Sequence, residues 1–422
     1  MFSREGSARG PFFFVFDIVI YSVAYLINPA GRYVACDDPK QFAELLTQGF
    51  TRPTPEQEQE HIKKKMQLIE DMKKAKVAKD NIYLATVSQQ GTDGYSTTSS
   101  GLIRELKKHD VNASTFFEGQ KVALLYHNPY SVLRLESPYR IIYTMFESDK
   151  IPDDWVEYLE AADKVLVPSK WCQEVFKKAG IETEVLPLGY DAETYQYIER
   201  PIKSKTRENF TFLHYNAFNI RKGFPEVLKA FTKAFKRDEP VRMIFKTTQN
   251  TLPFPLVQSE YPHIEVIKGK FNAVEMSELL ARSDCFVFPS RGEGFGITPL
   301  ETMATGMSCI LPNAHGLSEY FNPECMYEVK VKEMCPALYS SYKGVDVGKM
   351  VVCDVDDLAR QMRYVYDHQE EAHVKGKQAS EYVKEFTIEK TGEKLAGILK
   401  KAIDMPLEDK PIRNQLNLEK IT

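Results

Sequence analysis

The chain changes its hydrophobic pattern near residue 79. From there on, short apolar runs rich in Val, Ile, Leu and Tyr alternate with amphipathic segments of helical period. This alternation predicts a parallel sheet covered by helices on both faces. We expect a first α/β domain over residues 79–191, with strands in the runs NIYLATVSQ, KVALLYH, YRIIYTMF, KVLVPS and TEVLPLGYD.

The same pattern restarts after a polar connection, AETYQYIERPIKSKTREN. It predicts a second doubly wound domain over residues 192–385, with strands in FTFLHYNAF, VRMIFKTT, IEVIKG, CFVFPS and MSCILPN. Residues 386–422 begin with a helical pattern that we expect to return to the first domain. The predicted fold class is therefore α/β, with two Rossmann-like domains facing a cleft and a ligand expected at the carboxyl ends of the strands.

Residues 1–78 form a predicted α+β appendage of unknown role. The apolar run over residues 11–27 is shorter than the ~20 residues that cross a bilayer and contains Asp17. The stretch YLINPAGRYVACDDP reads as strand, turn and strand, so we interpret this region as a β-hairpin followed by helices. An interfacial or anchoring helix and a signal peptide are the alternatives.

Composition serves mainly to exclude classes of protein. The chain has 55 Lys and Arg residues and 59 Asp and Glu residues, so it lacks the excess of positive charge that favours sequence-independent nucleic-acid binding. The seven cysteines are scattered, without a CxxC pair, and indicate neither a disulfide framework nor a zinc site. We expect buried thiols and a cytoplasmic location, with peripheral contact with a membrane surface left open. Asp354 and Asp356 precede a predicted helix, where acids cap helices, so we expect no metal there.

The stretch RGEGFGITPLETMATG holds the clearest candidate chemistry, with Glu293 and Glu301 eight positions apart. Thr298, Pro299 and Glu301 fit a capping box at the start of a helix, and Gly306 would end that helix. A capping box explains Glu301 without any ligand. It does not explain Glu293.

Three glycines surround that glutamate, at positions 292, 294 and 296. They follow a predicted buried strand and precede a helix, so they would expose backbone N–H groups at a helix N-terminus. Such a loop suits a phosphate, a sugar or both. A tight turn without a ligand is the alternative.

The longer stretch FPSRGEGFGITPLETMATGMSCILPN closely resembles the signature of family-4-type retaining glycosyltransferases of the GT-B fold. In that signature Pro-Ser precedes Glu-Gly-Phe-Gly, and a second Glu opens the following helix. Supporting blocks recur in the expected order, namely GTDGYS, DKVLVPSKWCQEVFKKAGI, LPLGYD, RKGFPEVLKAF and VDDLARQM. The resemblance covers residues 81–403. It implies transfer of a hexose-like unit from a nucleoside diphosphate sugar with retention at the anomeric carbon, and it implies neither a metal nor a cofactor besides this donor.

The resemblance also implies roles for the residues of the motif. Glu293 would accept hydrogen bonds from hydroxyls of the donor sugar, and Glu301 from the ribose hydroxyls of the nucleotide. Carboxylates suit this role because they are pure acceptors, and their charge strengthens the bonds. Backbone N–H groups for the sugar and the diphosphate would come from Gly294, Phe295, Gly296 and Ile297.

The block NIRKGF supplies the predicted cations, Arg221 and Lys222. By the resemblance, Lys222 would contact the donor phosphates and stabilise the leaving diphosphate; two solvated charges at a helix start are the alternative. Many relatives carry another arginine where this chain has Ala217, and compensation by Arg221 or by Lys246 is a hypothesis. In the first domain, Gly94 would bring backbone N–H groups to the diphosphate, unless its loop is only a strand-to-helix turn.

The first domain would hold the acceptor, which the sequence does not identify. His127 and Glu147 end two consecutive strand candidates at the cleft edge, although a lone His is more often structural. Relatives often have a histidine where Glu147 stands, which puts the acceptor-side chemistry in doubt. A glycan, a lipid-linked sugar, a protein and a modified nucleic acid stay open as acceptors. A non-catalytic nucleotide-sugar or glycan binder, an epimerase and a hydrolase on the same scaffold are the alternative functions.

Overall fold

The computed structural model forms two compact units, Met1–Lys76 and Val77–Thr422. In the first, β1 (Ala24–Ile27) pairs antiparallel with β2 (Tyr33–Cys36), which is the predicted hairpin. The apolar run before residue 24 and much of the predicted helical region lie outside the described residues. The structure describes residues 24–27, 29, 31, 33–36, 45–57, 59–61, 63–64, 81–86, 94–206, 209–217, 219–248 and 262–406.

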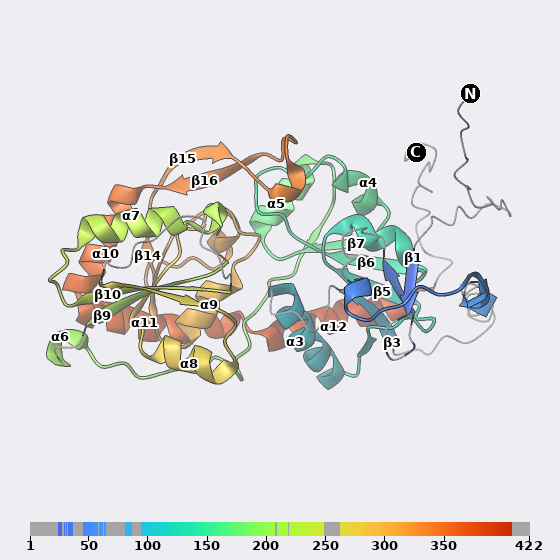
Figure 1. Cartoon of the computed structure of the whole chain (residues 1–422), viewed down its shortest axis with the longest axis horizontal. Helices are drawn as coiled ribbons and strands as arrows, with labels where there is room; N and C mark the ends of the chain where they lie inside the picture. The colour runs from blue at the N-terminus through green and yellow to red at the C-terminus, as the bar shows by residue number, and fades with distance from the viewer. Residues whose placement is uncertain are drawn as a thin grey trace, which may run out of the picture. The chain divides into compact units, whose positions relative to one another are not determined.

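The second unit begins with an N-terminal lobe built on a parallel sheet of order β4-β3-β5-β6-β7-β8. Buried side chains of α3 (Gly94–Lys108) and α12 (Ile388–Asp404) pack on one face of the sheet, and those of α4 (Trp155–Glu160) and α5 (Lys170–Lys178) pack on the other (Figure 1). The strands are β3 (Asn81–Thr86), β4 (Asn112–Ser114), β5 (Val122–Tyr126), β6 (Tyr139–Tyr143), β7 (Lys164–Val167) and β8 (Glu184–Val185).

The C-terminal lobe holds a second parallel sheet, of order β11-β10-β9-β12-β13-β14. Its strands are β9 (Phe210–Tyr215), β10 (Val241–Thr247), β11 (Ile264–Lys268), β12 (Cys285–Val287), β13 (Ser308–Leu311) and β14 (Tyr327–Glu328). Its helices are α6 (Lys203–Thr206), α7 (Phe224–Ala234), α8 (Ala273–Ala281), α9 (Ile297–Ala304), α10 (Val355–Asp367) and α11 (Gln369–Tyr382). The predicted α/β class with two Rossmann-like sheets is confirmed.

Burial on both faces explains why the strands read as continuous apolar runs. Successive residues of β9, Phe212 and Leu213, are both fully buried and belong to different apolar clusters. Phe212 packs with α7 and α10, whereas Leu213 packs with α8 and α9. The strand order reverses between β9 and β12, and the carboxyl ends of strands at such a reversal are where α/β sheets bind ligands.

Among the described residues, the sequence pattern missed four strands and the short helix α6, which lies in the predicted polar connection. The edge strands β4 and β14 are only three and two residues long. The other two, β15 (Val331–Pro336) and β16 (Lys349–Cys353), form an antiparallel hairpin that belongs to neither large sheet. Most side chains of β15 are exposed, so its sequence lacks the apolar run that marks the other strands. Within the described part of the chain, no helix has both the length and the apolar character needed to cross a bilayer.

Candidate active site

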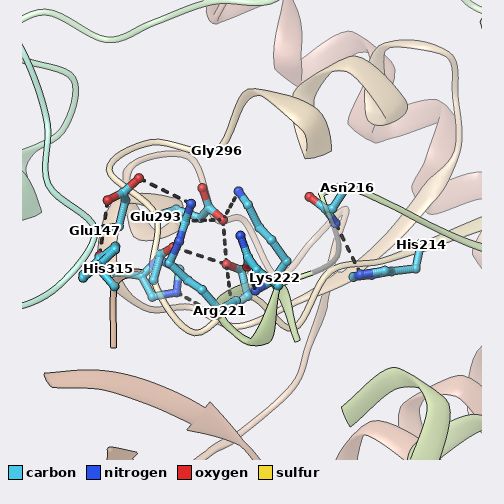
Figure 2. A network of polar contacts seen from close by, with 12 residues as sticks. Glu147, His214, Asn216, Arg221, Lys222, Glu293, Gly296 and His315 are labelled. Atoms are coloured by element: carbon cyan, nitrogen blue, oxygen red, sulfur yellow. Dashed lines mark hydrogen bonds and ion pairs between the residues drawn. The ribbon is translucent and has the colours of Figure 1, made fainter. Parts of the chain in front are cut away.

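The loops that follow β9 and β12 lie side by side at the point where the strand order of the C-terminal lobe reverses. The first loop leads through the short 3-10 helix η2 (Ile220–Lys222) into α7. The second contains the glycine-rich motif and leads into α9. Figure 2 shows that their charged side chains point toward one another in a single network. The parallel register brings together residues about 70 positions apart in the sequence.

Glu293 is the centre of this network. Its side chain is only 8% exposed, and its Oε1 lies 2.6 Å from Lys222 Nζ and 3.3 Å from Arg221 Nη1. Ser290 Oγ donates a third contact to the same oxygen at 2.6 Å. Burial alone would raise the pKa of Glu293, but Lys222 and Arg221 outweigh that effect and hold it at about 2. The carboxylate is therefore charged at neutral pH.

Arg221 joins this network to the N-terminal lobe. Its Nη1 donates to the carbonyl of Gly292 at 2.6 Å, and its Nη2 lies 3.4 Å from Glu147 Oε1. Glu147 follows β6 in the chain, so the ion pair crosses from one lobe to the other (Figure 2). Burial opposes the charge of Arg221, but Glu147 and Glu293 raise its pKa above the ordinary value. Arg221, Lys222, Glu293 and Glu147, four of the residues singled out by the sequence, thus meet in one place.

The glycines of the motif allow the two lobes to touch. A Cβ on Gly292 would lie 1.9 Å from the carbonyl oxygen of Glu147, and one on Gly294 would lie 2.6 Å from Met145. Ser169 Oγ also donates to the Gly294 carbonyl at 2.8 Å. These two glycines therefore have a structural role in addition to any ligand binding: Gly292 lies against the backbone of the N-terminal lobe and Gly294 against the Met145 side chain.

The predicted capping box at Glu301 is wrong. Helix α9 begins at Ile297, because Gly296 adopts the left-handed conformation (φ 88°) and acts as the N-cap residue without a side-chain bond. Thr298 consequently lies inside the first turn instead of capping it. The Glu301 carboxylate accepts a hydrogen bond from the hydroxyl of Tyr215 at 2.9 Å. The predicted helix end is confirmed, since Gly306 follows the last turn with φ 82°.

Glu301 occupies a second acidic position, half-buried, and no cation among the described residues forms an ion pair with it. Burial raises its pKa to about 7, and hydrogen bonds from Tyr215 and Tyr195 only partly offset that rise. The two glutamates of the motif therefore differ electrostatically. Glu293 is a charged partner of two cations, whereas Glu301 is an acid poised near neutral pH between two phenol hydroxyls.

Backbone donors lie between these two acids. Within the described residues, no protein acceptor takes the N–H groups of Phe295, Gly296 and Ile297. These groups form the N-terminal end of α9, where the helix dipole favours an anion. Phe295 is fully buried and its ring packs edge-on against Tyr320, whereas Gly296 and Ile297 are partly exposed.

The remaining predicted site residues make other contacts. Lys246 donates to the carbonyl of Gly269 at 2.5 Å and lies 4.2 Å from the centre of the Phe271 ring. Within the described residues, no hydrogen bond or ion pair joins it to the network. Gly94 begins α3, but residues 87–93 of its loop lie outside the described part. His127 follows β5, and the centre of its ring lies 5.2 Å from the centre of the Tyr95 ring.

Two buried histidines lie near the motif that were not predicted from the sequence as site residues. His214 contacts the Val287 carbonyl through Nδ1 at 2.8 Å, and burial lowers its pKa to about 4. His315 has a left-handed backbone (φ 43°), and its Nε2 lies 3.0 Å from the carbonyl of Ser290. Burial likewise lowers its pKa to about 4. Both are neutral at pH 7 and donate to carbonyls, so they stabilise the loops. The only signal in the sequence was the position of His214 near the end of a strand candidate.

The acids of CDVDD have structural roles. Asp354 caps α10 by accepting from the backbone N–H groups of Asp356 and Asp357, as the sequence predicts. Asp356 pairs with Lys233 at 2.6 Å. Nowhere among the described residues do three His, Cys, Asp or Glu side chains gather in the manner of a metal site.

Part of the chain is similar to a known family. Residues 197–326 match the family described as "Glycosyl transferases group 1". A protein named "Putative glycosyltransferase ORF313" from Acidianus filamentous virus 1 (isolate United States/Yellowstone) is 29% identical over 188 residues. The match covers 42% of this chain and 54% of that protein, so the chain spans about half the length of this relative.

Solved structures resemble a larger part of the chain. Sucrose-phosphate synthase from Thermosynechococcus elongatus has a TM-score of 0.59 at 13% identity over 76% of this chain and 98% of that one. HepE from Anabaena, solved in complex with UDP-glucose, has a TM-score of 0.55 at 12% identity over 76% and 99%. A glycosyltransferase from Rickettsia africae has 0.56 at 13% over 78% and 100%. At these identities the likeness shows the fold, which is the predicted GT-B arrangement.

Proposed function

We propose that the chain transfers a hexose-like unit from a nucleoside diphosphate sugar to an acceptor, with retention at the anomeric carbon. The match of residues 197–326 to the glycosyl transferases group 1 family supports glycosyl transfer. The observation that carries this proposal is the Glu293 network, in which a buried carboxylate faces two cations at the strand-order reversal. A UDP-sugar is the first donor to try, since HepE was solved with UDP-glucose.

The donor diphosphate would lie at the N-terminal end of α9, between its free backbone N–H groups and the cations. Lys222 and Arg221 would then stabilise the negative charge that grows as the diphosphate leaves. Glu293, held in place by the same cations, would accept hydrogen bonds from the sugar hydroxyls. Of the two residues that could replace the arginine missing at Ala217, Arg221 is the better candidate. Arg221 contacts Glu293, whereas Lys246 does not.

The reaction breaks the bond between the anomeric carbon and the diphosphate oxygen and forms a bond from the acceptor oxygen on the same face of the sugar. The acceptor oxygen itself attacks the anomeric carbon, so no protein carboxylate forms a bond to the sugar, and the acceptor proton passes to the leaving diphosphate oxygen. Contact between the lobes excludes water and limits hydrolysis of the donor. The chain requires no metal for this step, because its own cations supply the positive charge.

Glu301 predicts a characteristic pH dependence of donor binding. Its pKa of about 7 means that its charged form appears only as the pH rises through 7. Ribose hydroxyls bind the charged form more strongly, so donor affinity should rise up to about tenfold between pH 6 and pH 8. Titration calorimetry with a nucleotide-sugar measures this well, since its esterified diphosphate does not titrate in that range.

The Glu301→Gln variant is the matched control for this prediction. Its amide keeps the shape of the side chain but cannot ionise, so its donor affinity should be weaker at pH 8 and flat between pH 6 and pH 8. A variant with the same slope as the wild-type protein would remove Glu301 from the proposed donor site.

Donor screening separates the proposed transferase from the alternative functions. Thermal shifts with UDP-, GDP- and ADP-sugars identify the nucleotide, and release of the nucleoside diphosphate is then followed with and without candidate acceptors. Transfer requires release that depends on the acceptor. Release of free sugar alone indicates a hydrolase, conversion of the donor to its epimer indicates an epimerase, and binding without turnover indicates a binding protein.

A further inference from the structure

The hairpin that the sequence pattern missed connects the two lobes. We call residues 331–353 the strap; it comprises β15, the short 3-10 helix η4 (Ser340–Tyr342) and β16. The strap leaves the C-terminal lobe after β14 and returns to it at α10. Figure 1 shows β15 and β16 running from the C-terminal lobe toward α5 of the N-terminal lobe.

Strand β16 bonds to the site loops of both lobes. The N–H of Val351 donates to the carbonyl of Arg291, the first residue of the glycine-rich motif, at 2.9 Å. Two residues earlier, the carbonyl of Lys349 accepts from the N–H of Asp149 at 3.1 Å, and the N–H of Lys349 donates to the Asp149 carboxylate at 2.6 Å. One short strand thus holds together the two loops that carry Glu293 and Glu147.

The tip of the strap belongs to the core of the N-terminal lobe. Ala337, Val347 and Met350 are buried in the same apolar cluster as Phe146 and Trp155 of that lobe. Close packing leaves no room for a side chain at Gly348, whose φ is 82° and whose Cβ would lie 2.3 Å from the Asp149 carboxylate. The strap is therefore a fixed connection between the lobes, and not a loose surface loop.

Two tyrosines of the strap place their hydroxyls on different partners. The hydroxyl of Tyr339 donates to Glu147 Oε2 at 3.2 Å, while Glu147 Oε1 faces Arg221. The hydroxyl of Tyr342 instead accepts from the indole N–H of Trp155 at 3.0 Å. Burial keeps the pKa of Tyr339 above its ordinary value, so its hydroxyl stays protonated and remains a donor.

We propose that Tyr339 is a positioning residue for the transfer reaction: it fixes Glu147, which in turn orients the Arg221 guanidinium beside Glu293. This inference rests on the proposed function for its kinetic consequence. Its geometry is a chain of three side chains that leads from the strap into the network at Glu293. Where the family often has a histidine, this chain has a carboxylate held from one side by the strap and from the other by Arg221.

The test compares Tyr339→Phe with Tyr342→Phe. Each removes one hydroxyl from the same strap next to the same Phe146 ring, but only Tyr339 contacts Glu147. Tyr339→Phe should lower kcat about tenfold, the size expected for one hydrogen bond to a charged group, and leave the donor KM within about twofold. Tyr342→Phe should keep kcat within about twofold. In a Glu147→Gln background, Tyr339→Phe should have little further effect, because both changes break the same chain.

Equal kcat values in the two tyrosine variants, or additive effects of Tyr339→Phe and Glu147→Gln, would overturn the proposal. A second readout needs no turnover: amide exchange of residues 219–223 should rise in Tyr339→Phe and stay at the wild-type rate in Tyr342→Phe. If the wild-type protein turns over no donor, the proposed function fails. The amide exchange of residues 219–223 then tests by itself whether Tyr339 positions Arg221. Wild-type exchange rates in both tyrosine variants would refute this role.

Discussion

The Glu293→Gln variant is expected to lose at least about 100-fold in kcat. Glutamine keeps the size of the side chain but removes the charge that orders Lys222 and Arg221 and that would bind the sugar hydroxyls. Losses of about 10²–10³ accompany the removal of one preorganised electrostatic group from an active site. The measurement is donor turnover under saturating donor, with the unfolding temperature recorded in parallel.

Alanine is the wrong substitution for this test. Either substitution removes the charge that pairs with Lys222 and Arg221. Glutamine keeps an amide oxygen that can accept from Lys222, whereas alanine leaves a void and no acceptor, so alanine adds a cavity cost to the loss of a buried ion pair, which is itself worth about 3–5 kcal/mol. A loss of activity in Glu293→Ala would therefore mix chemistry with unfolding. Wild-type kcat in a folded Glu293→Gln protein would refute the role assigned to Glu293.

The second large effect is expected at Lys222. Its Nζ lies 2.6 Å from Glu293 and 5.6 Å from the centre of the Phe288 ring, so the ammonium is held at the carboxyl end of the sheet. Methionine fills a similar volume without the charge. Lys222→Met should lower kcat by about 10²–10³, because in the proposed site the leaving diphosphate would lose the positive charge of Lys222.

An exposed lysine on α7 supplies the control. Lys229→Met removes the same charge from the same lobe and should leave kcat unchanged within about twofold. If only the loss of one positive charge from the protein mattered, kcat would fall equally in both variants. A Lys222→Met protein that retains wild-type turnover would show that the cation serves only to pair with Glu293 in the folded protein.

The fold could be predicted because a strand that is buried on both faces of a parallel sheet needs apolar residues at successive positions. Strands such as β5, whose five residues are all buried, are therefore found from the pattern. The short edge strand β14 and the exposed β15 leave no such signal. The strap also depends on contacts such as that between Tyr339 and Glu147, which are 192 positions apart, and no local pattern encodes them.

The site was predictable in its residue types and less so in its geometry. Glu293 and Lys222 stood out as charges beside glycines, and the parallel register brings them together. The capping box failed because Gly296 can adopt a left-handed backbone, so α9 starts before Thr298. Lys246 was a reasonable candidate as a cation at a strand end, yet its ammonium is occupied by carbonyls and by Phe271.

A crystal structure with the nucleotide-sugar that gives the largest thermal shift would show where the donor binds. We expect ribose hydroxyls within about 3 Å of Glu301, the diphosphate beside Lys222 and the N-terminal end of α9, and sugar hydroxyls hydrogen-bonded to Glu293. A donor bound at another place, or one in this place whose sugar points away from Glu293, would contradict the proposed donor site.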